Sequence, residues 1–143
     1  MHVRELTHAD VPAALELANT RPYSNCFLIS LLERNALTGI VGTFDNATLV
    51  GIASTGANCV TTDLTDEAAG ALASQLASEG RRSASIVGRK ENVQKLWAAL
   101  DGRWGAPRAI RELQPLLLLR RQPELAGDPL VRRATPSCRS SAR

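Results

Sequence analysis

The chain has 143 residues, of which 44% are hydrophobic and 22% charged, and its formal net charge is +3. This length and composition are typical of one globular domain and exclude two full-size domains. Aromatic residues make up only 3%, so few side chains could stack on nucleobases, and many of the arginines lie in the last third of the chain. We therefore expect no nucleic-acid partner.

The cysteines do not predict a disulfide framework or a metal site. Their number is odd, they lack CxxC spacing, and neither His2 nor His8 lies near one of them in sequence; they are Cys26, Cys59 and Cys138. We interpret Cys26 and Cys59, which have apolar neighbours, as small core residues. No apolar run approaches the length of a membrane span, and the N-terminus lacks an apolar signal region. We expect a cytoplasmic protein with no membrane partner.

The N-terminal part predicts one strand and two helices. Residues 2–6 alternate between apolar and polar side chains, as a strand does. Residues 7–19 predict a helix that Thr7 caps, with Asp10 in its first turn. Residues 24–37 predict a second helix that is apolar on most sides and should therefore be largely buried.

Three β runs and a third helix follow. Residues 38–55 contain two of the runs, separated by Asp45-Asn46, a dipeptide that tolerates the left-handed geometry of a tight hairpin. Residues 57–64 extend the antiparallel sheet. The helix after them ends at Gly80, and its apolar face is formed by Ala68, Ala69, Leu72 and Leu76.

The remaining chain predicts a short buried strand at 83–88, a helix at 89–102 and a last strand at 109–120, where Pro115 favours an edge or bulge position. We expect Trp97 in the core and Trp104 packed on a turn. The predicted order is βααβββαβαβ. It defines an α/β (α+β) three-layer fold with a mixed, mostly antiparallel sheet and helices on both faces. The domain would span 1–119, and residues 120–143, rich in Arg, Pro, Ser and Gly, would be a linker or disordered tail.

This order of elements resembles the GNAT superfamily of acetyl-CoA-dependent N-acetyltransferases. The word "LVGIA" with Gly51 and the position of Asn92 at the start of the late helix resemble the family's pattern. More specifically, "RPYSNCFLISLLE" and "LWAALDGRWGAPRAIRELQPLLLL" resemble a GNAT-like domain of unknown function, which precedes the catalytic domain in GNAT proteins of high-G+C Gram-positive bacteria. The resemblance covers residues 1 to about 132. It implies acetyl-CoA as the full-length family's cofactor, and either a C-terminal catalytic GNAT domain or a homodimer as partner.

In GNAT catalytic domains, Gly-rich amides in the turn after the central strand bind the cofactor's pyrophosphate. Here the corresponding residues are "TTDLTDEAAG". Three carboxylates, those of Asp63, Asp66 and Glu67, lie at the start of the helix, where Thr65 or Asp66 can cap it. Because like charges repel a pyrophosphate, we expect no tight acetyl-CoA binding at this turn.

A second strand–helix turn, "SIVGRKEN", has the opposite polarity and could hold an anion. It supplies the candidate cofactor-binding residues Gly88, Arg89, Lys90 and Asn92. The alternative interpretation is a solvated helix start at which Glu91 offsets Lys95 at i, i+4.

The sequence predicts no catalytic residue. The GNAT family places a tyrosine general acid one or two turns after the Asn, but residues 96–99 read Leu-Trp-Ala-Ala, and the chain's only tyrosine is Tyr23. We expect an N-terminal domain of a GNAT acetyltransferase that is inactive alone. The alternatives are a ligand- or protein-binding module on a degenerate acetyltransferase fold, and a small acetyltransferase that binds its cofactor at the Gly88 turn. Residues 134–143 depart from the resemblance, so we also expect that a catalytic half was lost by truncation or frameshift.

Overall fold

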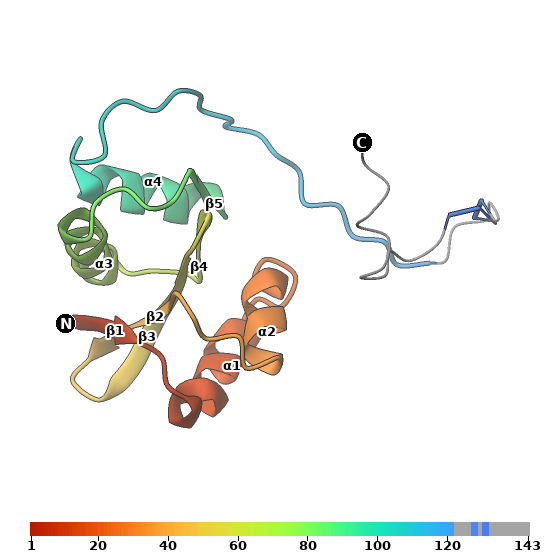
Figure 1. Cartoon of the computed structure of the whole chain (residues 1–143), viewed down its shortest axis with the longest axis horizontal. Helices are drawn as coiled ribbons and strands as arrows, with labels where there is room; N and C mark the ends of the chain where they lie inside the picture. The colour runs from red at the N-terminus through yellow and green to blue at the C-terminus, as the bar shows by residue number, and fades with distance from the viewer. Residues whose placement is uncertain (122–126, 129, 132–143) are drawn as a thin grey trace, which may run out of the picture.

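A five-stranded sheet with helices on both faces forms the domain (Figure 1). The computed structural model describes residues 1–121, 127–128 and 130–131. Strand order in the sheet follows the chain, with β1 to β4 antiparallel and β5 parallel to β4. The strands are β1 (His2–Glu5), β2 (Ile40–Asp45), β3 (Thr48–Thr55), β4 (Asn58–Thr61) and β5 (Ser85–Val87). The predicted mixed, mostly antiparallel α+β fold is confirmed.

One face of the sheet is covered by the short 3₁₀ helix η1 (His8–Asp10) and by helices α1 (Val11–Asn19) and α2 (Cys26–Glu33). Successive side chains of a strand point to opposite faces, so Ile40 and Phe44 of β2 pack here while Val41 packs on the other face. Thr7 precedes η1, and its N–H and hydroxyl both donate to Asp10 at 2.7 Å.

Helix α2 is less buried than its composition predicts. Only Leu28 and Leu32 are buried, whereas Phe27 is 46% exposed and Cys26 is exposed. The prediction of a largely buried helix, with Cys26 in the core, is therefore wrong. The physical reason is that α2 has one face on the sheet, and no other layer of the described chain covers its outer side.

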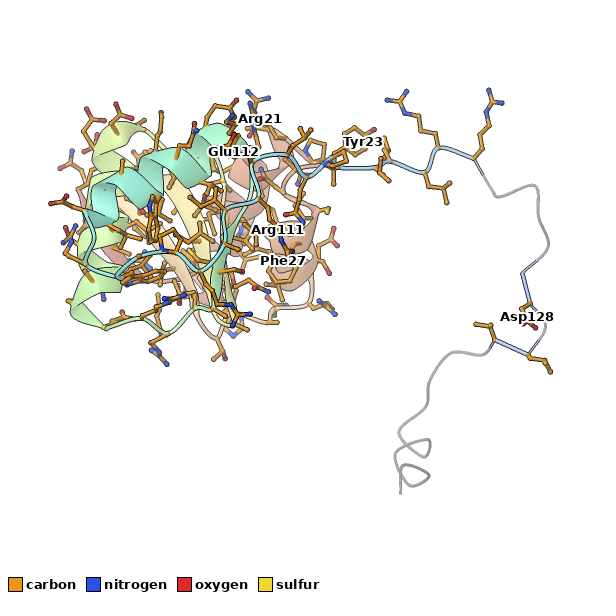
Figure 2. The ribbon with its side chains drawn as sticks, turned by 90° about the horizontal axis from the view of Figure 1, so that it is seen from above. Arg21, Tyr23, Phe27, Arg111, Glu112 and Asp128 are labelled. Atoms are coloured by element: carbon orange, nitrogen blue, oxygen red, sulfur yellow. The ribbon has the colours of Figure 1, made fainter. Side chains whose placement is uncertain are left out.

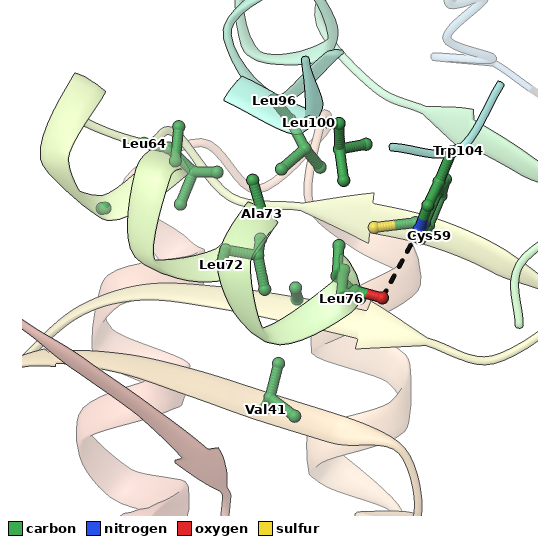
Figure 3. Packing of buried hydrophobic residues seen from close by; sticks show 12 residues of the cluster. Val41, Cys59, Leu64, Leu72, Ala73, Leu76, Leu96, Leu100 and Trp104 are labelled. Carbon is green, nitrogen blue, oxygen red and sulfur yellow. Dashed lines mark hydrogen bonds between the residues drawn. The ribbon is translucent and has the colours of Figure 1, made fainter. Parts of the chain in front are cut away.

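The opposite face is covered by α3 (Asp66–Ser78) and α4 (Lys90–Leu100). Their leucines pack against Val41 and Cys59 of the sheet (Figure 3). Trp104 closes this core from the turn after α4, where its indole N–H donates to the Leu76 carbonyl oxygen at 3.4 Å. The predicted core position of Cys59 and the packing of Trp104 on a turn are confirmed, while Trp97 is only partly buried against the cluster.

The predicted turn residues act close to where they were expected. The turn between β2 and β3 consists of Asn46 and Ala47, one position later than the predicted Asp45-Asn46. Asn46 has the left-handed φ of +53°. Gly80 has φ of +76° directly after the C-cap of α3, a conformation that favours glycine. The predicted end of this helix is confirmed.

The last predicted strand is not formed. Residues 109–120 contain neither strand nor helix and leave the domain as an extended segment (Figures 1 and 2). Leu113 and Leu117 are 89% and 85% exposed. A strand needs a hydrogen-bonded neighbour, and none is present in the described chain; β5 therefore remains an edge strand, half-buried rather than buried as predicted. The predicted tail from 120 onward lies mostly outside the described residues.

Candidate functional site

Two strand–helix turns meet at one edge of the sheet. Strands β4 and β5 are parallel neighbours, so their carboxyl ends lie side by side, and each leads directly into a helix. Beside the first turn is an open pocket of about 450 Å³, lined by Val50, Asp63, Leu64, Thr65, Asp66, Glu67 and Lys95. Carboxyl ends of parallel strands are common ligand positions in α/β folds, so this edge is the candidate site.

The β4–α3 turn is closed by contacts within the protein. The Thr65 hydroxyl accepts a hydrogen bond from the Ala68 N–H at 3.2 Å, which confirms Thr65 as the helix cap. Lys95 of α4 donates to the Leu64 carbonyl oxygen at 3.1 Å and lies 3.3 Å from Asp66. Asp66 and Glu67 are in the first turn, where carboxylates interact favourably with the helix dipole.

Gly51 explains how Leu64 fits beneath this turn. A Cβ atom at Gly51 would lie 2.6 Å from a terminal methyl carbon of Leu64, which is buried. Strand β3 therefore leaves the room that Leu64 fills. The glycine in "LVGIA" has a packing role at the base of the site.

Asp63 joins the two turns. Its carboxylate accepts a hydrogen bond from the Asn92 side-chain amide at 2.8 Å and one from Arg21, and Arg89 lies 3.5 Å away. Partial burial opposes the charge, but the hydrogen bonds from Asn92 and Arg21 and the charges of Arg89 and Arg21 outweigh it, so the pKa of Asp63 lies below its ordinary value. An internal anion thus occupies the point at which the donors of both turns converge.

The second turn contributes only part of its predicted residues to this point. Arg89 reaches Asp63 and also Glu91, at 3.6 Å. Asn92 is 5% exposed and bridges the turns, because its side-chain oxygen accepts from the Leu64 N–H at 3.4 Å.

Two other predicted residues place no side chain against Asp63. Lys90 lies 4.0 Å from Glu112, and Gly88 contributes no side chain. The expected Glu91–Lys95 offset is wrong, since Glu91 pairs with Arg89 and Lys95 with Asp66.

Arg21 was not predicted as a site residue. It follows α1, and 42 positions separate it from Asp63. No local motif marks it, because only the packing of α1 on the sheet brings it to the edge of β4. Covariation with Asp63 in an alignment would be a signal able to find it.

Other chemistry-bearing groups lie outside the site. Tyr23 is 58% exposed in the loop between α1 and α2. Burial raises the pKa of the Cys59 thiol to about 12, so this cysteine is a neutral core group. Within residues 1–121 and the other described positions, no three His, Cys, Asp or Glu side chains gather as metal ligands. The same part of the chain contains no helix of sufficient length and apolar character to span a bilayer. Cys138 lies outside the described residues.

The chain is thus an α+β domain whose two neighbouring strand–helix turns are joined by side chains of the domain itself. A family model described as a domain of unknown function, DUF4081, matches residues 38–139, and the chain belongs to this family. The chain is also similar to the crystal structure of a single-substitution mutant of TTHA1254 from Thermus thermophilus, with 21% identity and a TM-score of 0.48, over 90% of this chain and 99% of that one. No curated protein matches the sequence.

Proposed function

We propose that this chain is the N-terminal, non-catalytic domain of a GNAT-family N-acetyltransferase that acts in the bacterial cytoplasm. In the full-length protein, a C-terminal GNAT domain transfers acetyl from acetyl-CoA to an amine. The domain described above contributes packing or substrate binding and does not bind acetyl-CoA tightly. The GNAT assignment rests on the resemblance carried by Gly51, Asn92 and the order of elements from β1 to α4; the last strand of the predicted order is not formed.

The position of Asp63 is the observation that supports the non-catalytic part of this proposal, the lack of tight acetyl-CoA binding. A pyrophosphate at the paired turns would need Arg21, Arg89 and the amides of both turns, but a carboxylate already neutralises these arginines. An incoming phosphate would also meet Asp66 and Glu67. Like charges this close oppose each other, so the site disfavours the anion that a GNAT cofactor presents.

Isothermal titration calorimetry with acetyl-CoA tests the proposal on the full 143-residue chain. We expect no saturable binding in the micromolar range. The Asp63→Asn variant should bind inorganic pyrophosphate more tightly than the wild type, because Arg21 and Arg89 lose their internal anion. Asp45→Asn, in an exposed position at the end of β2, is the matched control and should bind as the wild type does. Micromolar binding of acetyl-CoA by the wild type would contradict the proposal.

A second candidate function, a protein-binding module on a degenerate acetyltransferase fold, is favoured by a different observation. The segment at 109–120 exposes five leucines, which form a larger apolar surface than scattered single residues would. Such a segment fits a partner protein better than a small molecule.

A further inference from the structure

The segment that we call the C-terminal arm, residues 109–121, makes almost no contact with its own domain. Among the described residues, no backbone hydrogen bond involves the arm, and its ion pair with the domain is between Lys90 and Glu112, at 4.0 Å. Beyond Glu112 the chain runs away from the sheet and helices (Figure 2). Its large apolar side chains are between 44% and 89% exposed, and they are Ile110, Leu113, Leu116, Leu117, Leu118 and Leu119.

We propose that this chain forms a two-fold symmetric dimer in which the arms of two copies pair as antiparallel β-strands centred on Leu116. The proposal concerns the arm alone and does not depend on whether the paired turns bind acetyl-CoA. A two-fold interface brings the same surface of each copy together, so a segment can serve if its sequence complements itself when reversed.

The arm meets this condition. With Leu116 opposite itself, Leu113 faces Leu119 and Glu112 faces Arg120 of the second copy. Each dimer therefore has two opposite-charge pairs that flank a leucine-rich centre, and cross-strand pairs of both kinds stabilise antiparallel strands. Arg111 faces Arg121 only at the solvated ends, where salt screens like charges.

Pro115 fits the same register. Antiparallel pairs alternate between hydrogen-bonded and non-hydrogen-bonded positions. If the central Leu116 pair is hydrogen-bonded, Pro115 and Leu117 form a non-hydrogen-bonded pair. The N–H that proline lacks would then point to the outer edge of the ribbon, a position that tolerates proline.

The exposed apolar surface of the arm favours pairing. Six large side chains at these exposures amount to roughly 700 Å² per copy, of which two paired strands cover only the sides that face the second copy. The buried area is therefore smaller than the ~800 Å² per partner of a standard interface, and we expect a weak dimer. An open leucine-rich strand that found no partner would instead be an aggregation hazard.

Analytical ultracentrifugation of the full chain, combined with charge reversal, tests the pairing. We expect a dimer with a dissociation constant in the micromolar range. Glu112→Arg and Arg120→Glu should each weaken it about ten-fold, because each turns two attractive pairs into repulsive ones, and the double variant should restore it. Lys90→Ala is the control for the internal contact of Glu112 and should leave the dimer unchanged. A monomer at all concentrations, or a dimer that the charge reversals leave unaltered, would overturn the proposal.

A cysteine at position 116, the centre of the proposed arm pairing, tests the register. In a Leu116→Cys variant the two thiols would face each other with Cα atoms about 5.5 Å apart, within the range of a disulfide. The matched variant Leu119→Cys would place them about 20 Å apart. In a Cys26→Ser, Cys138→Ser background, which removes the exposed native thiol and the one outside the described residues, mild oxidation should therefore link the Leu116→Cys dimer covalently, while the Leu119→Cys variant stays unlinked. Equal linking of the two variants would contradict this register.

Discussion

Leu72 of α3 and Leu117 of the C-terminal arm are the same residue type in similarly apolar stretches, but their surroundings are opposite. Leu72 is fully buried between α3 and the sheet, whereas Leu117 is 85% exposed. Both stretches satisfy the apolar criterion for an element of the core. The difference shows that an apolar run becomes part of a core only where another element presents a surface to it.

Alanine substitution of these two leucines should give the largest difference in stability. Leu72→Ala removes packed methyl groups and leaves a cavity, so we expect the free energy of unfolding to fall by about 2 to 5 kcal/mol. Leu117→Ala should change it by less than about 0.5 kcal/mol at concentrations where the chain is monomeric. Urea unfolding of both variants measures the two values. Similar losses for both would mean that the arm packs on its own domain.

Truncation of Asn92 should have the next largest effect. Asn92→Ala leaves the Leu64 N–H and the Asp63 carboxylate without their shared partner, and we expect a loss of about 1 to 3 kcal/mol. Gln94→Ala, at an exposed position two residues later in α4, controls for the better helix propensity of alanine. The comparison uses urea unfolding at neutral pH. Equal stability of the Asn92→Ala and Gln94→Ala variants would contradict the inference that Asn92 links the two turns.

The smallest expected effect is a dependence of the unfolding free energy on pH through Asp10, near the N-terminus. Asp10 accepts hydrogen bonds from Arg4 at 2.8 Å and from Thr7 at 2.7 Å, and these contacts hold its pKa well below its ordinary value. A carboxyl with a lowered folded-state pKa stabilises the fold fully above its unfolded pKa, about 3.9, and loses this contribution as the pH falls toward the folded pKa.

Asp10→Asn should therefore be less stable than the wild type by about 1 kcal/mol at pH 7. The gap should narrow as the pH falls below about 4. Thermal unfolding of both proteins between about pH 2 and pH 7 measures it. Glu16→Gln, at an exposed position of α1, controls for the removal of a surface carboxylate and should leave the stability at pH 7 close to that of the wild type. A gap independent of pH would contradict the ionic origin of the effect.

Periodicity and turn residues predicted most of the fold. The face of α3 with Ala68 and Leu72, the end of that helix at Gly80 and the Thr65 cap all depend on neighbours within a few positions. Two predictions that depended on distant partners were wrong. Cys26 is exposed because α2 has only one neighbouring layer, and the arm is not a strand because no strand of the described chain lies beside it.

Most residues of the candidate site could be predicted from the sequence, but the contacts that join them could not. The acidic first turn and the basic second turn were both visible in the sequence, and Asn92 was marked at the start of its helix. What the sequence did not reveal is that the two turns bond to each other through Asp63, or that Arg21 joins them from 42 residues away. Parallel pairing of β4 with β5 creates this meeting point, and no local pattern encodes it.

The most direct test of the closed edge is a ¹⁵N-resolved NMR titration of the full chain with acetyl-CoA. If the carboxylate of Asp63 occupies the place of a pyrophosphate, the backbone amides of Thr65 to Ala69 and of Gly88 to Asn92 should keep their chemical shifts throughout the titration. Saturable shifts of those amides at micromolar acetyl-CoA would contradict the account.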